Sequence, residues 1–368
     1  MLISPILEAE PDFDAESQSP ESSENVIVLS TRVRLARNLN DHSFPGWSKP
    51  EQRKEVLEKC CLAIQKLSQM QGASTFYLED LSPLERKILV ERHLISRELA
   101  EADKTQGAGV VISKNQRCSI MINEEDHLRI QYISQGLEIE NTWRVIDSID
   151  NALEELVDYA FSEEYGYLTS CPTNVGTGMR ASAMMHLPAL VLDGHMDRVI
   201  RAVNQAGIAV RGLFGEGSEA SGSIFQISNQ QTLGVSEQEI LQNLNKFLET
   251  IIQRERDVRQ KLVEDEPAKL RDKIGRAYGI FKYAHFLSSN EAMNLLSLLR
   301  LAIDLGFILS SESLQKRMNQ LLIESQPGHV QYAIKQHPPN SSKDHYRANY
   351  FRKQFEDLPC PNFDKLSL

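Results

Sequence analysis

The chain has 368 residues, 41% of them hydrophobic, and a formal net charge of −11. This length and apolar content allow a substantial buried core, divided over one large domain and a smaller one. The acidic balance excludes a protein that binds nucleic acid over its whole surface, because such surfaces are basic, but it leaves room for a local basic site.

The chain begins with a segment predicted to be a disordered acidic lead, residues 1–25. Residues 8–25 are rich in Glu, Asp, Ser and Pro. They contain too little apolar surface to offset the entropy of an unfolded chain. Order is predicted to begin at the apolar run 26–29.

The next elements are helices and a hairpin. Residues 48–70 have apolar side chains at helical spacing behind a proline-containing first turn, and residues 84–102 are a second candidate helix. The strand-like runs 109–113 and 118–122 enclose a polar turn, which predicts a β-hairpin. An amphipathic pattern over 149–161 predicts a further helix.

Short strands are predicted at residues 188–192, 209–213 and 224–227. A long helix follows, in which Ser236 and Glu239 form a capping box at the start of an apolar periodic run. The mixture of hairpins and helices, without strict strand–helix alternation, favours an α+β fold with an antiparallel sheet flanked by helices.

The remainder of the chain is predicted to form a small all-helical C-terminal domain. The charged run 254–265 marks the exit from the sheet-containing domain, and residues 266–325 contain helical patterns only. A polar, partly loop-like segment then leads to a short helix at 344–355. The predicted domains are the lead (1–25), the sheet-containing domain (26–258) and the helical domain (259–368).

The cysteine content and the hydropathy indicate the cellular compartment of the protein. The five cysteines are odd in number and lack metal-ligand spacing, which fits a reducing cytosol better than a disulfide framework. No apolar run reaches the roughly 20 residues that cross a bilayer. The start of the chain lacks the basic region of a signal peptide. The sequence therefore predicts a cytoplasmic protein without membrane or nucleic-acid partners.

Four segments combine glycine, arginine and carboxylate in patterns that a packed core does not require. They are STRVR at 30–34, NEEDHLR at 123–129, CPTNVGTGMR at 171–180 and RGLFGEGSE at 211–219. Guanidinium forks bind phosphate oxygens in pairs, so converging arginines would form a polyphosphate cradle. Any one of these arginines alone is more often a surface ion pair. The candidates are Arg32, Arg34, Arg129, Arg180 and Arg211.

The carboxylates suit a guanidinium acceptor. A free guanidinium has a pKa above about 12 and is a poor nucleophile until a proton is withdrawn in a defined geometry. Two carboxylates that grip it from different sides would align it and accept that proton. Glu124, Glu125 and Asp126 are consecutive, and Glu216 lies in a glycine-bounded loop typical of a mobile element. An acidic run by itself is usually a solvated loop or a helix cap.

Cys171 precedes Pro172 and a Thr-Asn-Val-Gly-Thr-Gly loop. Nearby positive charge lowers the pKa of a thiol, so a thiolate here would add negative charge beside a guanidinium. A buried, inert cysteine is the alternative. The piece from Gly176 to Gly178 lacks the Lys-Ser/Thr ending of a P-loop, which excludes a standard nucleoside-triphosphatase site.

Together the four segments resemble the phosphagen (guanidino) kinase family. The match covers about residues 26–255, and the strings NEEDHLR and CPTNxGTGxRAS occur in order and at compatible distances. The resemblance implies an antiparallel sheet flanked by helices, the guanidino kinase catalytic fold. It also implies transfer of the γ-phosphoryl group of ATP to a guanidinium nitrogen, with Mg²⁺ arriving on the nucleotide.

The resemblance also assigns site residues. Glu125 would be the catalytic base, Glu216 the second carboxylate at the guanidinium, and Cys171 the active-site cysteine. Spacing alone would make His93 structural, whereas the resemblance makes it a nucleotide contact. The residues that would line the ATP site are Ser30, Thr31, Arg32, Val33, Arg34, His93, Arg129, Arg180, Ala181, Ser182, Ala183, Met184, Arg211, Gly212, Leu213, Phe214, Gly215 and Glu216.

The acceptor is expected to be arginine in proteins. Members that act on small molecules carry a helical domain before the segment that matches Ser30, where this chain has a short lead. The RGLFGEGSEA loop resembles that of the protein-directed members. Two alternatives stay open: a kinase of free arginine or another small guanidine, and a non-catalytic regulator that binds phosphoarginine. The intact catalytic motifs speak against the regulator.

The C-terminal region resembles a domain with a phosphoarginine-binding Arg-Asp-x-x-Arg-Ala motif used in allosteric control. The equivalent here is degenerate: Lys343, Asp344, Arg347 and Ala348. Lysine keeps the charge but loses the bidentate fork. By family analogy the protein would act in the stress response, with an activator protein, a Clp-type protease and a homodimeric assembly. The residues themselves leave these partners open.

Overall fold

The computed structural model of the protein describes residues 1–8, 27–212, 221–336 and 342–364. They form two compact units. The first lies within residues 1–184, 203–210 and 227–248, and the second within residues 185–202, 211–226 and 249–368. The predicted boundary at 258/259 falls inside the long helix α7 (Glu237–Asp265), and the division into units falls inside the same helix, after residue 248. The predicted domain limits are not tested by this division and stay a prediction. No helix in these described stretches is long and apolar enough to span a bilayer.

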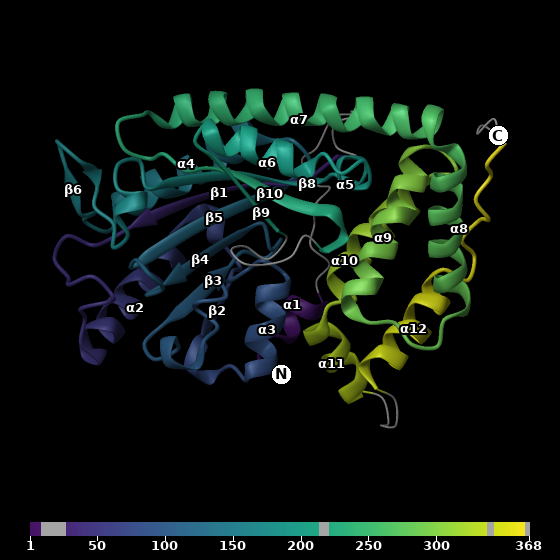
Figure 1. Cartoon of the computed structure of the whole chain (residues 1–368). Coiled ribbons are helices and arrows are strands. Elements are labelled where there is room, and N and C mark those ends of the chain that lie inside the picture. Colours follow the sequence, from purple (N-terminus) through teal and green to yellow (C-terminus); the bar gives the residue numbers. More distant parts are fainter. Residues whose placement is uncertain (9–26, 213–220, 337–341, 365–368) are drawn as a thin grey trace. The chain divides into compact units, whose positions relative to one another are not determined.

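Among the described residues, eight strands form one sheet in the order β2-β3-β4-β5-β1-β8-β10-β9 (Figure 1). The pairs β1–β5, β2–β3, β3–β4 and β4–β5 are antiparallel, which confirms the predicted α+β class. The strands are β1 (Val28–Arg37), β2 (Ser74–Tyr77), β3 (Gly109–Ile112), β4 (Cys118–Ile122), β5 (Leu128–Gln135), β8 (Met179–His186), β9 (Ile208–Gly212) and β10 (Ile224–Asn229).

Strand β1 shows how the sheet separates core from site. Side chains alternate between the two faces of a strand. Thr31 and Val33 have no exposed surface and lie in the core, whereas Ser30, Arg32 and Arg34 are half-buried on the other face. One face of β1 therefore stabilises the fold, and the other is available to a ligand.

Helices and short turns connect the strands. Helix α3 begins with a capping box, in which Ser82 Oγ accepts from Glu85 N and the Glu85 carboxylate accepts from Ser82 N. The helices up to the long α7 are α1 (Ser4–Glu8), α2 (Pro50–Gln65), α3 (Pro83–Glu91), α4 (Ile139–Glu154), α5 (Pro188–Leu192) and α6 (Met196–Gln205). Single 3₁₀ turns lie at Ser68–Met70, Leu78–Asp80, Ala102–Lys104, Pro172–Asn174 and Ser221–Ser223.

The start of the chain differs from the predicted disordered lead. Ile3, directly before α1, and Ile6, within α1, are buried. Leu2 N donates to Glu85 Oε1 at 2.7 Å, and Arg92 Nη1 donates to Ile6 O at 2.7 Å. Two apolar side chains and these backbone partners hold residues 1–8 in place. The remainder of the lead, residues 9–26, lies outside the described residues.

The segment 188–192, predicted as a strand, is the helix α5. Pro188 suits the first position of a helix because its missing N–H needs no partner there. The Glu255 carboxylate accepts from Ala189 N and Leu190 N at 3.0 Å each, so a distant side chain caps this helix. The prediction was wrong because that cap lies far away in the sequence.

Two predicted helices have different limits. Helix α3 ends at Glu91, earlier than predicted, because His93 adopts a left-handed φ of 59°. The helix predicted at 149–161 lies at Ile139–Glu154 instead. It ends there because the chain becomes extended, and Tyr159 forms an antiparallel bridge with Leu39.

The second unit is mainly helical, as predicted for residues 266–325. Its core includes Phe281 against Phe351 and Phe355, with ring centroids 4.6 and 5.1 Å apart. Helix α11 replaces part of the segment predicted as loop-like. The helices are α8 (Pro267–Tyr283), α9 (Ser289–Asp304), α10 (Glu312–Glu324), α11 (Pro327–Gln336) and α12 (Lys343–Gln354).

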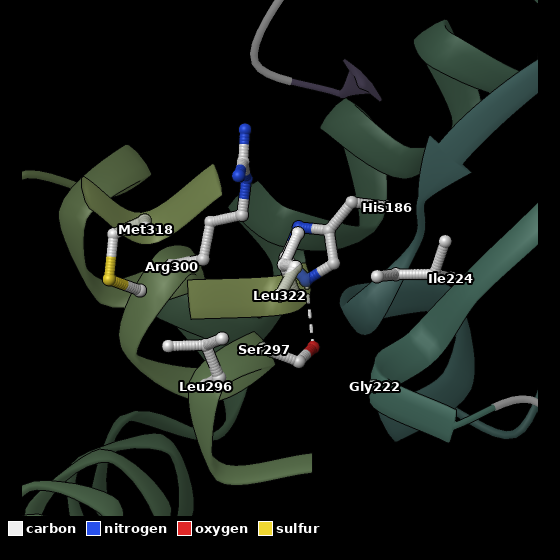
Figure 2. A pocket seen from close by; sticks show the side chains of 8 residues that line it. All are labelled: His186, Gly222, Ile224, Leu296, Ser297, Arg300, Met318 and Leu322. Atoms are coloured by element: carbon white, nitrogen blue, oxygen red, sulfur yellow. Dashed lines mark hydrogen bonds between the residues drawn. The ribbon is translucent and has the colours of Figure 1, made fainter. Parts of the chain in front are cut away.

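A small cavity lies inside the second unit, and Figure 2 shows the side chains that line it. His186 is 1% exposed, and its Nε2 lies 2.7 Å from Ser297 Oγ. Its Nδ1 has no hydrogen-bond partner among the described residues. Burial and the charges of Arg300 and Arg259 hold the pKa of His186 well below its ordinary value, so the ring is neutral.

Candidate active site

The pairing of β1 with β5 places three of the predicted arginines on one face. Ala36 on β1 lies directly opposite Arg129 on β5. Opposed residues of an antiparallel pair share a face, and side chains alternate along each strand. Arg32, Arg34 and Arg129 therefore point to the same side of the sheet.

Arg180, on the neighbouring strand β8, completes the group, which we call the arginine face: Arg32, Arg34, Arg129 and Arg180. Burial and the charges of Arg129 and Arg180 lower the pKa of Arg32 to about 10. Burial and the other three arginines hold the pKa of Arg34 well below its ordinary value. The buried Nε of Arg34 has no hydrogen-bond partner among the described residues. Concentrated positive charge with an unpaired donor suits a polyanion such as a nucleotide triphosphate.

Two of these arginines are oriented by the protein. Arg129 Nη1 lies 2.7 Å from each carboxylate oxygen of Glu124, and Ser96 Oγ donates to the same carboxylate at 2.7 Å. Burial raises the pKa of Glu124, but the charge and hydrogen bonds of Arg129 outweigh it and keep this pKa below its ordinary value. Arg180 donates from Nε and Nη2 to Ser228 Oγ at 3.2 and 3.0 Å.

The other predicted contacts on β8 divide between its two faces. By strand alternation Ser182 and Met184 share the side of Arg180. Ser182 Oγ donates to the backbone carbonyl of β1 at Arg32, 3.3 Å away. Ala181 and Ala183 are fully buried on the opposite face. The side chains of these two alanines therefore belong to the sheet core.

His93 lies near the arginine face. Burial and the charges of Arg32 and Arg97 lower the pKa of His93 to about 4, so its imidazole is neutral near pH 7. Its backbone carbonyl accepts from Gln131 Nε2, on β5, at 2.6 Å. This bond fixes the residue in its left-handed conformation beside the sheet.

The NEEDHLR segment forms the turn between β4 and β5, and two of its residues hold that turn. Asn123 has a φ of 57° and no exposed surface, and its Nδ2 donates to Gly107 O at 2.8 Å. His127 accepts from Leu39 N at Nδ1 (3.1 Å) and donates from Nε2 to Ser43 O (3.0 Å). Burial lowers the pKa of His127 to about 4.

Asp126 brings together the segments of Glu125 and Cys171, two residues predicted to contact the guanidinium that receives the phosphoryl group. Its Oδ1 accepts from Asn38 Nδ2 at 2.6 Å and from Ser170 N at 2.7 Å. Asp126 follows Glu125 in the chain, and Ser170 precedes Cys171. The hydrogen bond between them therefore fixes the turn that carries Glu125 against the loop that carries Cys171.

Glu125 has the properties of a general base. Its side chain is exposed. Although the side chain reaches the surface, surrounding protein atoms displace part of the water around its carboxylate, and this desolvation together with the charges of Asp126 and Glu124 raises the pKa of Glu125 above its ordinary value. The carboxylate is therefore more basic than an ordinary one. Cys171 is partly exposed, and its Sγ lies 3.0 Å from Thr173 Oγ1.

The glycines of the Cys171 loop serve close backbone contacts. Gly176 has a φ of 108°, and a Cβ there would lie 2.2 Å from Thr232 O. Gly178 has a φ of 61°, and a Cβ there would lie 2.6 Å from Ala36 O. Only glycine fits these positions. They hold the loop on the sheet.

Part of the predicted site is not placed with this group. Arg211 and Gly212 end β9 and belong to the second unit. Leu213, Phe214, Gly215 and Glu216 lie outside the described residues. The position of the second carboxylate therefore stays a prediction. No group of three or more His, Cys, Asp or Glu in the described stretches is suited to hold a metal ion.

The degenerate motif lies on α12 of the second unit. Arg347 is 1% exposed and donates from Nε to Ser325 O at 2.9 Å. Its Nη1 donates to Leu287 O at 2.8 Å and to Asp344 Oδ1 at 2.7 Å. Ala348 is buried in the helical core, and Lys343 Nζ donates to Gln331 Oε1 at 3.0 Å.

The sequence did not reveal several residues that support the site. Asn38 contacts both Asp126 and the backbone of His127, and Ser228 binds Arg180. Ser96 orients Glu124. Asn38 directly follows the arginine-rich strand, and this polar residue at a strand end was the only local signal.

Comparison with known proteins gives matches over both parts of the chain. Residues 55–258 match the family described as ATP:guanido phosphotransferase, C-terminal catalytic domain. Residues 267–366 match the protein-arginine kinase McsB C-terminal domain.

Similar proteins of two kinds are found. The protein-arginine kinase of Brevibacillus brevis is 44% identical over 339 residues, covering 91% of this chain and 93% of the relative. That of Pelotomaculum thermopropionicum is 44% identical over 347 residues, covering 94% and 96%. Among solved structures, lombricine kinase is 25% identical with a TM-score of 0.57, covering 67% of this chain and 71% of that chain. The duplicated taurocyamine kinase of Schistosoma mansoni with transition state analog components is 26% identical with a TM-score of 0.59, covering 68% and 36%.

Proposed function

The chain belongs to the ATP:guanido phosphotransferase family, and we propose that it transfers the γ-phosphoryl group of ATP to a guanidinium nitrogen of arginine in proteins. One observation carries the chemistry: the arginine face lies on the same sheet as the turn that presents Glu125, a carboxylate of raised pKa. The acceptor is supported by relatives, matched over nearly their whole length, that are protein-arginine kinases.

The arginine face binds the phosphates of ATP. Forked, permanently charged donors neutralise the charge that spreads over the transferred group in the transition state. The residues fit a polyanion, because Arg34 keeps a buried donor unpaired, and burial and the charges of Arg129 and Arg180 lower the pKa of both Arg32 and Arg34. Mg²⁺ comes with the nucleotide, since phosphate oxygens and water are its preferred ligands. His93, neutral and beside Arg32, contacts the nucleotide without adding charge.

Glu125 activates the acceptor. Its carboxylate takes a proton from the arginine guanidinium, whose nitrogen then forms a bond to the γ-phosphorus as the bond to the β-phosphate oxygen breaks and ADP leaves. Asp126 keeps Glu125 close to the Cys171 loop. In this proposal Cys171 and Glu216 contact the guanidinium from other sides. Much of the catalysis is positioning and electrostatic stabilisation.

We propose a cellular role for the phosphoarginine that the protein forms. Phosphoarginine on proteins would mark them for regulation or for degradation by a Clp-type protease in the cytoplasm during stress. Phosphoarginine would also act on the C-terminal domain through Asp344 and Arg347, with Lys343 in place of an arginine. An activator protein and a homodimer belong to the same proposal.

The chief alternative acceptor is free arginine. Incubation of the purified protein with ATP and either casein or free arginine, followed by measurement of ADP and of acid-labile phosphate, separates the two. The proposal expects acid-labile phosphate on casein and its loss in Glu125→Gln. If phosphate is found on free arginine and not on casein, the substrate is a small molecule and not a protein.

A further inference from the structure

A small hairpin stands directly before the Cys171 loop. Its strands are β6 (Phe161–Ser162), labelled in Figure 1, and β7 (Gly166–Tyr167). The two strands are antiparallel, and Phe161 pairs with Tyr167. We call residues 161–167 the 161–167 hairpin. None of the chemistry described above uses it.

The 161–167 hairpin is fixed to the Cys171 loop through Tyr167. Tyr167 N donates to Gly176 O at 2.8 Å, and Gly176 N donates to Tyr167 O at 3.3 Å. Gly166 approaches the same backbone so closely that a Cβ there would lie 2.5 Å from Gly176 O. The Tyr167 ring covers the Arg37 guanidinium, 3.5 Å from the ring centroid, and Arg37 pairs with buried Asp150. The hairpin is therefore joined by backbone and side-chain contacts to the loop that carries Cys171.

The outer side of the 161–167 hairpin is both aromatic and acidic. Phe161 is 56% exposed and Tyr165 is 48% exposed. Between them Glu163 and Glu164 are exposed, and their carboxylates form no ion pair within the described stretches of the chain. Ser162 Oγ accepts from Glu164 N and Tyr165 N, at 3.3 and 3.4 Å, which orders the turn. Exposed aromatic rings beside unpaired carboxylates complement a basic partner, because its cations can stack on the rings and be attracted by the acids.

We propose that the 161–167 hairpin docks the basic segment of a protein substrate that flanks the acceptor arginine. This inference rests on the proposed function and adds a subsite to it. Guanidinium and ammonium groups of the flanking residues stack on Phe161 and Tyr165 and are attracted by Glu163 and Glu164. Because the hairpin is bonded to the Cys171 loop, a chain held there presents a neighbouring arginine to Glu125. A small guanidine has no flanking residues and gains nothing from this subsite.

The first test removes the rings. Phe161→Ala with Tyr165→Ala is compared with wild type on two peptides that share one acceptor arginine, of which only one has further Lys or Arg beside it. For the basic peptide KM rises roughly fivefold to thirtyfold, as expected for two cation–π contacts, whereas kcat and the KM for ATP stay unchanged. The peptide without flanking charges is unaffected. Tyr283→Ala with Phe286→Ala, an exposed aromatic pair of the second unit, is the matched control.

The second test uses binding instead of turnover. The fluorescence anisotropy of a labelled basic peptide is titrated with Glu125→Gln protein, with and without Glu163→Gln and Glu164→Gln. The hairpin acids raise affinity at low salt and lose their effect as salt screens them. Glu79→Gln with Asp80→Asn, another exposed acidic pair of the first unit, leaves affinity unchanged.

The outcomes separate the two proposals. Equal KM and affinity in wild type and both hairpin variants overturns the docking site while leaving the kinase function intact. A change of oligomeric state in the hairpin variants, without a change in peptide affinity, also overturns it, because the surface would then join copies of the chain. Failure of the wild-type enzyme to phosphorylate any arginine contradicts the proposed function itself.

Discussion

Asp126 accepts a hydrogen bond from the backbone nitrogen of Ser170 at 2.7 Å, and this contact joins the two loops that carry the predicted acceptor residues. The same oxygen accepts from Asn38 Nδ2 at 2.6 Å, so three separate segments meet at one buried carboxylate. The turn that carries Glu125 is therefore held against the loop that carries Cys171 by a residue outside the predicted catalytic set.

Asp126→Ala should weaken both fold and catalysis. It leaves two donors, on Asn38 and Ser170, without their acceptor, and each unpaired buried donor costs about 1–3 kcal/mol. We expect the free energy of unfolding to fall in urea titrations and kcat to drop about tenfold or more, because the acceptor residues lose their alignment. Asp126→Asn keeps an acceptor oxygen at Oδ1 and should retain most of both. An alanine variant with wild-type kcat would show that this bond does not position Glu125.

Glu125→Gln should remove the base without disturbing the fold. We expect kcat to fall about 10²- to 10⁴-fold, with an unchanged melting temperature, because the side chain is exposed. The base acts only when it is deprotonated. Since its pKa is raised in the folded enzyme, activity should fall on acidification at a pH above the ordinary carboxyl value of about 4.3. Retained activity in the glutamine variant would assign the proton to another group.

Arg34→Met should separate stability from nucleotide binding. The four arginines repel one another, so removal of one charge should leave the free protein as stable as wild type or more stable. The KM for ATP should rise roughly tenfold to hundredfold, since hydrogen bonds to charged groups contribute about 1.5–3 kcal/mol. Thermal unfolding without ATP measures the stability, initial rates at varied ATP measure the KM, and the ATP-induced rise in melting temperature reports binding. A rise in melting temperature with ATP as large in the variant as in wild type would contradict the role of Arg34 in binding the phosphates.

His127 should make stability depend on pH. Its pKa is about 4 in the folded protein, below the ordinary value of about 6.5, so the unfolded chain binds more protons between these values. The stabilisation is therefore complete above about pH 6.5 and is lost as the pH falls towards 4. His127→Gln should flatten this slope by up to about 1.4 kcal/mol per pH unit. The free energy of unfolding of both proteins is measured in urea at pH 7, 6 and 5. If it falls equally with pH in wild type and in His127→Gln, His127 does not cause the pH dependence.

Arg347 should be needed for the fold of the second unit. Its buried guanidinium binds Ser325 O, Leu287 O and Asp344, and lysine cannot reproduce this fork. Arg347→Lys should lower the free energy of unfolding by about 2–4 kcal/mol. Lys343→Arg, at an exposed position, should leave stability unchanged and increase the thermal stabilisation by phosphoarginine. If phosphoarginine stabilises neither wild type nor this variant, the motif is structural only.

Local patterns in the sequence predicted the elements that local interactions determine. The capping box of Ser236 with Glu239 forms at the start of α7, with Ser236 N donating to Glu239 Oε2 at 2.8 Å. The hairpin of β3 and β4 and the C-terminal helices also follow from nearby residues. Strand β8 was not recognised as a complete strand, because its neighbours in the sheet, β1 and β10, are far away in the chain. Strand β5 was not recognised either, although β4 precedes it directly, because its pairing with β1 joins residues about a hundred positions apart.

The candidate site divides in the same way. Strand alternation predicted Arg32 and Arg34 on one face, and the family resemblance placed Glu125 and Cys171 in one site. In the structure the β1–β5 register adds Arg129 to that face, and the Asp126–Ser170 bond joins the turn of Glu125 to the loop of Cys171. The supporting contacts were beyond a single sequence. Arg180 and Ser228 are separated by 48 residues, and only the folded sheet places one against the other.

Mass spectrometry of a protein substrate after reaction with ATP, prepared under non-acidic conditions that preserve the P–N bond, tests the central claim most directly. We expect phosphate on arginine side chains of the substrate, and none when Glu125→Gln replaces the wild-type enzyme. Phosphate only on free arginine, or on serine, threonine and tyrosine but never on arginine, would contradict it.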